Sequence, residues 1–375
     1  MASTRTRAAF VGEPGGQWEV AEFELDEPKE NEVRVALKAA GLCHSDEHVR
    51  AGSPSYRYPI IGGHEGAGVV EAVGAGVSRV KVGDHIATSF IPICGTCRYC
   101  STGHQNLCDT GQYAAIGCLQ DGTFRFHRDG ADIGSICALG TFSERTVVSE
   151  SSCVRIDDDL PFEVAALVSC GVTTGWGSAI YAAGVKAGDA VVIIGIGGVG
   201  INAVQGARYA GAQHIVAIDL VPFKLNMALK LGATFATSDP EEAARHIQEV
   251  TRGQLADHAI ITVGVANLDT FKLAVSLIGK NSDVVVTSVG NSTSVSLALD
   301  PGPSLSTWQK RIQGSLFGNA NPLRDIPLLL SLYRSGDLKI DELITARYQL
   351  DEINQAYTDM WDGKNMRGLV TFDGA

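Results

Sequence analysis

Four cysteines lie close together in the run CGTCRYCSTGHQNLC, and their spacing is typical of a metal site. Cys94, Cys97 and Cys100 follow one another at C-x-x-C spacing, and Cys108 comes one short loop later. Four thiolates at this spacing can surround one borderline-soft zinc ion tetrahedrally. An iron–sulfur cluster is an alternative, although Asp109 stands where the bacterial cluster motif has proline. Because four protein ligands leave no open position for a substrate, we expect this zinc to be structural.

Three other residues could form a second metal site that keeps an open position. Cys43 occurs in GLCHSDEHVRAG, His64 in GGHEGAGVV and Cys170 in LVSCGVTTGWGSA. Two cysteines, one histidine and a water form one of the known catalytic zinc arrangements. Cys170 also lies at the joint between two parts of the chain, where ligand clefts tend to form. Spacing alone leaves open whether each residue is a ligand or an ordinary buried side chain.

A third group of residues predicts a dinucleotide site. Gly195, Gly197 and Gly200 form G-x-G-x-x-G after the apolar run AVVIIG, and a second apolar run ends in Asp219. In this context the glycines allow a tight turn, close approach of a pyrophosphate and close packing of a helix, while the acid reaches the ribose. A carboxylate at Asp219 repels a 2′-phosphate, so NAD is favoured over NADP. Lys224 either reaches the ribose from the other side or is a solvated helix lysine.

Composition excludes several other classes of protein. The chain has 375 residues, enough for about two domains, and a formal net charge of −12. Without a basic cluster, this charge argues against a nucleic-acid partner. The first residues, MASTRTRAAF, lack the long apolar stretch of a signal peptide, and no run approaches the about 20 apolar residues of a membrane span, so we expect a cytoplasmic protein. In that compartment its nine cysteines should not be paired in disulfides.

The elements that must position these residues change in character along the chain. Up to about residue 170, short β-branched runs such as NEVRVALKAAG and KVGDHIAT alternate with turn residues, which predicts a β-rich, barrel-like unit. From there to about 310, continuous apolar runs alternate with helical patterns, which predicts a doubly wound parallel sheet. The expected domains are 1–171 with a metal lobe at about 94–108, then 172–312, and 313–375 returning to the first domain.

Taken together, these motifs resemble the zinc-dependent medium-chain alcohol dehydrogenases nearly end to end. The matching motifs are GxCxSDxHV, GHEGAG, the four-cysteine loop, DGTFRF, GTFSERTVV, CGVTTGWGSA, GIGGVG and NMRGLVTF. The resemblance implies an α/β protein, with a GroES-like β-rich catalytic domain and a Rossmann coenzyme domain. It also implies an oxidoreductase that interconverts alcohols and aldehydes by hydride transfer to NAD, with one catalytic and one structural zinc per subunit.

The resemblance assigns roles around the catalytic zinc. It implies that Cys43, His64 and Cys170 hold this ion, with Glu65 close to it and able to loosen its coordination. Asp46 should orient the His64 imidazole. The remaining implied catalytic groups form a proton relay from the bound alcohol to solvent, made of Ser45 and His48.

Cofactor and substrate contacts also follow from the resemblance. His44 and Arg367 should meet the pyrophosphate, while Thr174 and Val199 press on the nicotinamide. The cofactor-binding residues expected in all are His44, Thr174, Gly195, Gly197, Gly198, Val199, Gly200, Asp219, Lys224 and Arg367. Phe90 and Trp308 resemble walls of the substrate channel.

Within this family, the nicotinoprotein branch of actinobacteria is the most similar. RIQGSLFG and NPxxDIPxLLSxY are among the stretches that carry this likeness. It implies NAD(H) held as a prosthetic group and re-oxidised by an unidentified external acceptor, for which dimethyl-nitrosoaniline substitutes in assays. The alternatives are an ordinary enzyme with exchangeable NAD, including one that oxidises a thiol adduct of formaldehyde, and a sensor that binds NAD and zinc without turnover. The family implies a homodimer or homotetramer. Cys118, Cys137 and Cys153 receive no role.

Overall fold

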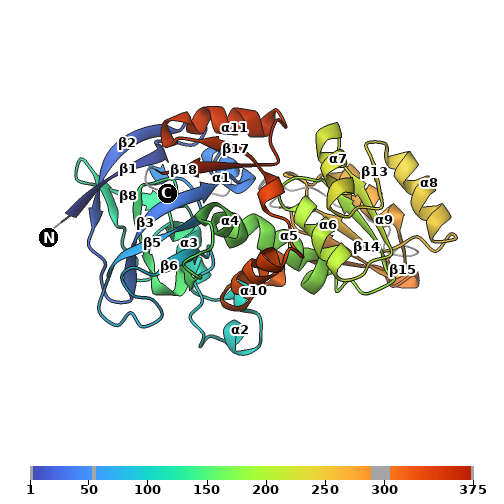
Figure 1. Ribbon diagram of the computed structural model, residues 1–375, viewed down its shortest axis with the longest axis horizontal. Helices are drawn as coiled ribbons and strands as arrows, with labels where there is room; N and C mark the ends of the chain where they lie inside the picture. Colours follow the sequence, from blue (N-terminus) through green and yellow to red (C-terminus); the bar gives the residue numbers. More distant parts are fainter. Residues whose placement is uncertain (1–2, 53–55, 289–304, 373–375) are drawn as a thin grey trace. The chain divides into compact units, whose positions relative to one another are not determined.

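The computed structural model describes residues 3–52, 56–288 and 305–372. Its contacts divide the chain into two compact units. The first unit comprises Met1–Cys170, Asn321–Gly336 and Ile340–Ala375, and the second comprises Gly171–Ala320 and Asp337–Lys339. The first unit therefore contains both ends of the chain (Figure 1).

Part of the first unit is a small closed barrel with the strand order β1-β2-β7-β8-β4. Its strands are β1 (Ser3–Val11), β2 (Glu19–Asp26), β4 (Ile60–Ile61), β7 (Phe126–Arg128) and β8 (Ala131–Ser135). Buried and exposed residues alternate near the end of β2, as expected for strands with one face toward a core. The β-rich, barrel-like unit predicted from the sequence is thus present as a closed barrel of paired strands.

A seven-stranded sheet forms the rest of the β-structure, with the order β10-β6-β5-β3-β18-β17 and β9 paired to β3. The strands are β3 (Glu32–Gly41), β5 (Glu65–Val73), β6 (His85–Thr88), β9 (Arg145–Ser149), β10 (Cys153–Arg155), β17 (Ile344–Tyr348) and β18 (Arg367–Thr371). In the antiparallel ladders, Gly41 at the end of β3 faces both Glu65 of β5 and Leu369 of β18. The last strand of the chain therefore lies beside the segments that carry Cys43 and His64.

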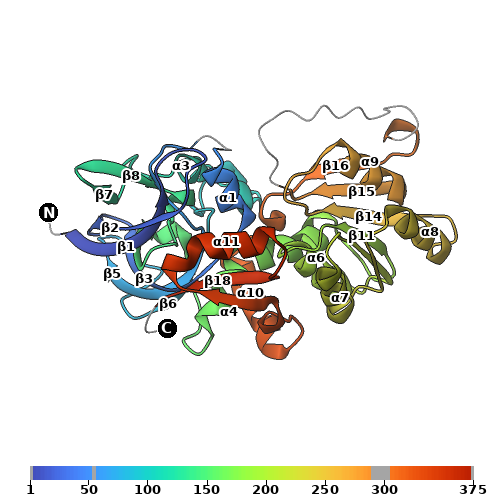
Figure 2. The same ribbon diagram turned by 90° about the horizontal axis from the view of Figure 1, so that it is seen from above.

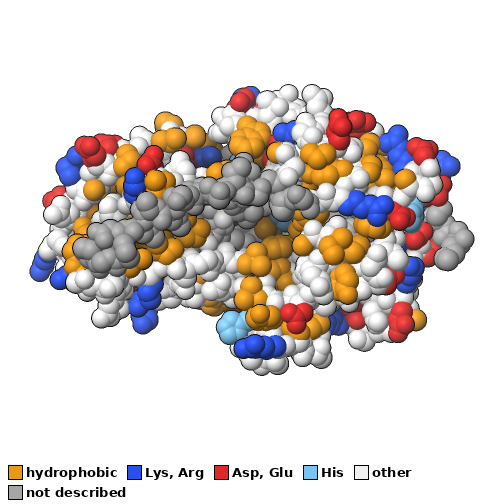
Figure 3. Space-filling view, turned by 180° about the vertical axis from the view of Figure 1, so that it is seen from behind, with side chains coloured by type: hydrophobic (Ala, Val, Ile, Leu, Met, Phe, Trp, Pro, Cys, Tyr) orange, Lys and Arg blue, Asp and Glu red, His pale blue; other side chains and the backbone are white. Residues whose placement is uncertain are grey.

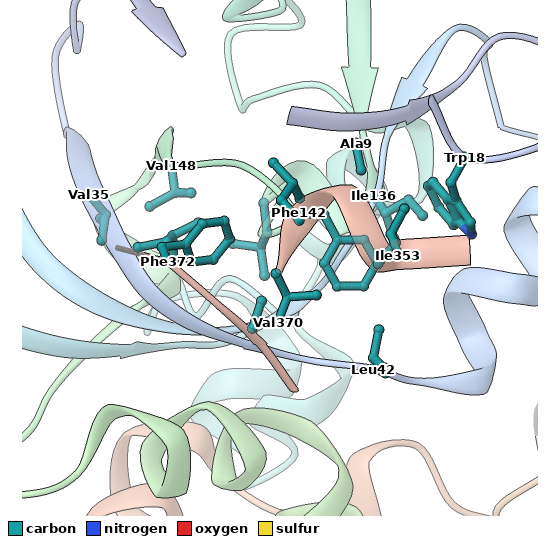
Figure 4. Close-up of a cluster of buried hydrophobic side chains, with 14 of the residues drawn as sticks. Ala9, Trp18, Val35, Leu42, Ile136, Phe142, Val148, Ile353, Val370 and Phe372 are labelled. Atoms are coloured by element: carbon teal, nitrogen blue, oxygen red, sulfur yellow. The ribbon is translucent and has the colours of Figure 1, made fainter. Parts of the chain in front are cut away.

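Apolar side chains between these strands and the C-terminal helix form a core cluster of the first unit (Figure 4). Trp18 and Phe142 meet edge to face, with ring centroids 5.8 Å apart, and Ile353 of the C-terminal helix is fully buried beside them. Val370 of β18 belongs to the same cluster. Burial of this apolar surface is the main force that holds the distant segments together.

Short helices connect the strands of the first unit. They are α1 (His44–Arg50), α2 (Arg98–Ser101), α3 (Gly111–Ile116), α4 (Phe162–Leu167), α10 (Pro322–Ser335) and α11 (Ile353–Trp361). Single 3₁₀ turns cover Gln105–Leu107, Ile136–Ala138, Glu150–Ser152, Asp341–Leu343 and Leu350–Glu352 in this unit, and Phe317–Asn319 forms another in the second unit. Asn321 caps α10 by accepting a hydrogen bond from the Leu323 amide, and Gly336 ends that helix in a left-handed conformation.

The second unit is built on a parallel sheet with the strand order β13-β12-β11-β14-β15-β16. The strands are β11 (Ala190–Ile194), β12 (His214–Ile218), β13 (Phe235–Thr237), β14 (Ala256–Ile261), β15 (Ile278–Val286) and β16 (Arg311–Gly314). The helices are α5 (Thr173–Gly177), α6 (Gly200–Tyr209), α7 (Pro222–Leu231), α8 (Pro240–Val250) and α9 (Leu268–Leu277). Helices α6 and α7 cover one face of the sheet and α9 covers the other (Figure 2). The strand order reverses between β11 and β14, and ligands bind beyond the carboxyl ends of strands at such a point.

One helical run in the described part of the chain, Phe162–Ala182, is long and apolar enough to cross a membrane. However, 89% of its apolar window is buried inside the protein, as in the core helix of a soluble protein. Cys170 lies within this run, in a π-helical turn over Val168–Val172. Such turns inside α-helices are frequently found at functional sites.

The described surface seen in Figure 3 carries acidic and basic side chains mixed with apolar ones. Acidic residues outnumber basic ones in the sequence, 42 to 30. The visible surface is therefore ordinary for an acidic globular protein.

Candidate active site

Four of the predicted metal-site residues come together in the first unit. One ligand atom from each of Cys43, His64, Glu65 and Cys170 lies within 4.8 Å of the others. Cys43 caps the N-terminus of α1, His64 and Glu65 stand at the start of β5, and Cys170 comes from the π-helical turn. The structure thus joins residues that are up to 127 positions apart in the sequence, as the resemblance implied.

The imidazole of His64 is oriented by a buried carboxylate. Its Nδ1 lies 2.9 Å from Oδ1 of Asp46, which also accepts a hydrogen bond of 3.1 Å from the amide of Gly63. Burial raises the pKa of Asp46. Burial lowers the pKa of His64, but the negative charges of Asp46, Cys43 and Cys170 raise it well above its ordinary value. With Nδ1 held by Asp46, Nε2 is the nitrogen left for a metal ion.

The sulfurs of Cys170, which is buried, and Cys43, which is partly buried, complete the set of soft donors. A hydrogen bond from Cys170 lowers the pKa of Cys43 well below its ordinary value, while the same contact raises the pKa of Cys170. One sulfur is therefore favoured as a thiolate, and a second thiolate beside it needs a positive charge to neutralise it. Two sulfurs and one imidazole nitrogen match the donor set of a catalytic zinc site, so these residues fit that ion.

The two carboxylate oxygens of Glu65 differ in their hydrogen bonding. One of its oxygens forms a buried ion pair with the guanidinium of Arg367, which also donates to the Leu42 carbonyl at 3.3 Å. Its other oxygen, Oε1, is buried and has no hydrogen-bond partner in the described part of the protein. Burial raises the pKa of Glu65 to about 7, against the opposing charge of Arg367. An unpaired buried oxygen within reach of the metal donors is consistent with a nearby cation.

Helix α1 carries the residues assigned to proton transfer. The hydroxyl oxygen of Ser45 lies 3.6 Å from the sulfur of Cys43, and His48 is partly exposed one turn later. His44 meets the indole ring of Trp361 edge to face, with ring centroids 5.2 Å apart. Phe90 packs edge to face against His64 at 5.8 Å, which places it beside the metal donors as expected of a wall residue.

The four cysteines of the loop also converge. Their sulfurs lie within 4.8 Å of one another, with 4.0 Å between Cys94 and Cys100 and 3.9 Å between Cys97 and Cys108. Tetrahedral zinc with Zn–S bonds of about 2.3 Å requires sulfurs about 3.8 Å apart. Burial opposes ionisation of Cys94, but the amides of Thr96 and Cys97 lower its pKa to about 6. Hydrogen bonds from amides favour thiolates here, so the loop fits a closed zinc site.

In the second unit the glycine loop follows β11. Gly195 has φ of +93°, and a β-carbon at Gly200 would lie 1.9 Å from the Gly195 carbonyl oxygen. A β-carbon at Gly197 would meet nothing within 4 Å, which leaves the backbone open to a ligand. Gly198 lies in the same loop and is partly exposed. The first and third glycines are therefore required by the fold, and the second keeps space free.

Asp219 is placed at the end of β12 beside this loop. Its carboxylate accepts hydrogen bonds from the amides of Ile196 at 2.6 Å and Val221 at 2.9 Å. Lys224 lies in the first turn of α7, shortly after it. Each carboxylate oxygen keeps a second lone pair for a ribose hydroxyl.

Thr174 and Val199 lie on neighbouring helices of the second unit. A β-carbon at Gly175, next to Thr174, would lie 2.0 Å from the Val199 carbonyl oxygen, so the two segments touch closely. The hydroxyl of Thr174 is buried without a hydrogen-bond partner in the described residues. Trp308 is exposed, with the Lys310 amine 5.2 Å from its ring centre, and it lies just before the beginning of β16, at the opposite end of the sheet from the glycine loop. The cofactor and channel contacts of these residues remain predictions.

Two features of the site escaped sequence reasoning. Arg367, expected at the pyrophosphate, forms its observed ion pair with Glu65, and its contact with the cofactor remains a prediction. Glu47 collects hydrogen bonds from two indoles and an arginine. The Arg367–Glu65 and Trp361–Glu47 contacts join residues 302 and 314 positions apart, Trp18 and Glu47 are 29 positions apart, and Arg50 contacts Glu47 within one helix. None of these contacts produces a recognisable pattern in the local sequence.

Two family descriptions match the chain. The Alcohol dehydrogenase GroES-like domain matches residues 29–158, and Zinc-binding dehydrogenase matches residues 198–334. An NDMA-dependent alcohol dehydrogenase of Amycolatopsis methanolica is 52% identical over 98% of both chains. The chain belongs to the zinc-dependent medium-chain alcohol dehydrogenases.

Other medium-chain alcohol dehydrogenases are also similar. Alcohol dehydrogenase B of Mycobacterium tuberculosis is 43% identical over 98% of both chains. An alcohol dehydrogenase zinc-binding domain protein from Burkholderia ambifaria has a TM-score of 0.92 at 30% identity, covering 99% of this chain and 100% of its own. Benzyl alcohol dehydrogenase of Acinetobacter calcoaceticus has a TM-score of 0.90 at 29% identity, covering 98% and 99%.

These matches confirm the predicted family, the GroES-like plus Rossmann fold and the enzyme class. The medium-chain dehydrogenase described here is an oxidoreductase that acts on small-molecule alcohols with zinc and a nicotinamide cofactor.

Proposed function

We propose that this enzyme oxidises alcohols to aldehydes with NAD(H) held tightly on the chain and re-oxidised in place by an external acceptor. The observation that carries the proposal is the 52% identity, over 98% of both chains, to the NDMA-dependent alcohol dehydrogenase of Amycolatopsis methanolica. The alternative, an ordinary enzyme with exchangeable NAD, shares the same donor set and glycine loop, so only the handling of the cofactor separates the two.

In this proposal each metal site has its own task. Cys43, His64 and Cys170 hold a catalytic zinc with Glu65 beside it, and the four loop cysteines hold a structural zinc, which gives two ions per chain. When bound, the catalytic zinc supplies a Lewis acid for the alcohol oxygen and NAD supplies the hydride acceptor. Asp46 fixes the tautomer and the direction of the His64 ring throughout.

The proton of the alcohol leaves through residues of α1. The Ser45 hydroxyl, whose oxygen lies 3.6 Å from the Cys43 sulfur, accepts this proton at Oγ and releases its own proton toward His48. His48 lies three positions further along the helix and is partly exposed, so its imidazole can deliver the proton to water. In the second unit, Asp219 and the glycine loop bind the adenosine ribose and the pyrophosphate, and Thr174 and Val199 orient the nicotinamide.

The decisive experiment asks whether the cofactor stays on the enzyme. Protein purified without added nucleotide and then denatured should release about one equivalent of NAD(H) per chain. The native protein should oxidise alcohols with dimethyl-nitrosoaniline as acceptor, and added NAD should not raise the rate. A nucleotide-free preparation that works only with added NAD would establish the alternative.

A matched pair of variants tests the metal assignment in the same preparations. Cys43→Ser should remove the catalytic zinc and the activity, because the site then has one soft donor fewer. Cys153→Ser is the control, since Cys153 is a buried cysteine outside both clusters of the described residues. Full activity and full zinc content in Cys43→Ser would contradict the assignment.

A further inference from the structure

Glu47 is a buried carboxylate in the middle of α1 to which neither the family motifs nor the proposed mechanism give a task. Its side chain is 3% exposed. Burying a carboxylate costs free energy of folding unless its oxygens accept hydrogen bonds. The donors to Glu47 therefore identify the segments that this side chain holds together.

Three side chains from three parts of the first unit donate to Glu47. The indole of Trp18, from the segment between β1 and β2, donates at 2.9 Å to Oε1. The indole of Trp361, the last residue of α11, donates at 3.1 Å to Oε2. Arg50 donates to both oxygens at 2.8 and 3.0 Å and also binds the Gly16 carbonyl at 2.8 Å. One carboxylate thus ties α1 to the N-terminal strands and to the C-terminal helix.

The two indoles differ in what else they touch. The ring of Trp361 meets His44 edge to face at 5.2 Å, and His44 is the first residue of α1, directly after the metal donor Cys43. The ring of Trp18 stacks on Tyr357 at 5.8 Å and meets Phe142, and neither of these is a predicted cofactor contact. Trp361 is also 57% exposed, whereas Trp18 is 3% exposed.

We propose that Glu47 is a positioning residue that, through the indole of Trp361, holds the His44 imidazole in the orientation that receives the cofactor's diphosphate. The proposal rests on the proposed function, because the role of His44 belongs to it. The hydrogen bond to Glu47 fixes the indole plane of Trp361, and contact with the indole limits the rotation of the His44 imidazole. The imidazole therefore loses less conformational entropy when the cofactor binds, which favours binding. A position 57% exposed would otherwise leave an indole free to rotate.

The test compares Trp361→Phe with Trp18→Phe. Each variant keeps an aromatic ring and removes one indole N–H donor from the same carboxylate, but only Trp361 touches His44. The dissociation constant of NADH for nucleotide-free protein, measured by fluorescence titration below both melting temperatures, should rise about two- to tenfold in Trp361→Phe. It should stay near the wild-type value in Trp18→Phe, although that variant should lower the melting temperature more because its ring is in the core.

A second readout does not depend on the cofactor. In nitrogen–proton NMR spectra of histidine-labelled protein, Trp361→Phe and Glu47→Gln should both shift and broaden the His44 ring signals, and Trp18→Phe should leave them in place. Equal NADH affinities for the two tryptophan variants, or unchanged His44 signals in Trp361→Phe, would overturn the positioning role. Failure of wild-type protein to bind NADH would overturn the proposed function, and the His44 signals would then decide on Glu47 alone.

Discussion

At the scale of single residues, several groups of the candidate site are held by side chains that are not themselves metal donors. Asp46 holds His64, Arg367 holds Glu65, and Glu47 connects the helix that carries Ser45 to two distant indoles. These supporting contacts fix orientation without touching a substrate. Loss of such a support usually lowers metal affinity or activity by about 10- to 100-fold.

Gly41 is a support of a different kind, because it leaves space. A β-carbon at this position would lie 2.0 Å from Oε2 of Glu65 and 3.1 Å from Nη2 of Arg367. We expect Gly41→Ala to displace this ion pair, to lower the free energy of unfolding by about 1–3 kcal/mol and to weaken zinc binding. Denaturant titration and competition with a chelator measure the two effects.

Gly111→Ala is the matched control for this substitution. A β-carbon at Gly111 meets nothing within 4 Å, and the residue begins α3 with φ outside the left-handed region. This variant should keep the zinc affinity and the stability of the parent. If Gly41→Ala also kept both, the Glu65–Arg367 pair would not constrain the metal donors.

At the scale of elements, an arrangement could be predicted from the sequence where all its residues lie in one continuous stretch, and it could not where distant segments pair. The β11–α6–β12 unit is visible in one continuous stretch, where apolar runs, three glycines and Asp219 follow in order. The pairing of β18 with β3 joins Leu369 to Gly41, and no periodicity in either strand specifies that partner. Cys170 was a candidate metal donor from its residue type and its place at the joint, but the sequence did not predict the π-helical turn that carries it, because such a turn has no sequence pattern of its own.

Asp219, directly after β12, allows a prediction about the preference for NADH over NADPH. Its carboxylate binds the amides of Ile196 and Val221, so it is fixed beside the glycine loop before any ligand arrives. Asp219→Asn keeps the size and one acceptor oxygen but removes the charge. We expect affinity for NADH to fall about tenfold and the preference for NADH over NADPH to shrink, because charged hydrogen bonds are the stronger ones. Titration with both nucleotides measures the ratio.

Asp257→Asn serves as the control in the same sheet. Asp257 accepts a hydrogen bond of 2.8 Å from the Ala190 amide at the beginning of β11, the opposite end from the glycine loop. Removing its charge should leave the ratio of NADH to NADPH affinity unchanged. Equal ratios for Asp219→Asn and the parent would show that Asp219 does not discriminate against the 2′-phosphate.

At the scale of the whole molecule, the two units have separate cores and separate chemistry. The described core of the second unit contains residues of its sheet and helices such as Val192, Ile261 and Phe271, whereas Trp18 and Phe142 belong to the core of the first. All eight metal donors found among the described residues lie in the first unit, and the glycine loop lies in the second. Metal removal should therefore loosen one unit and leave the other folded.

Hydrogen exchange before and after treatment with phenanthroline tests this division. Removal of zinc should leave four thiols crowded in the loop and two sulfurs beside His64, so amides of residues 94–117 and of α1 should exchange faster. Amides of β11 and β14 should exchange at the original rate, because their core shares no residue with the metal donors. Alcohol turnover should disappear and should return when zinc is added back. Faster exchange in β11 and β14 to the same degree would mean that the units unfold together, so that their cores depend on each other despite being built from different residues.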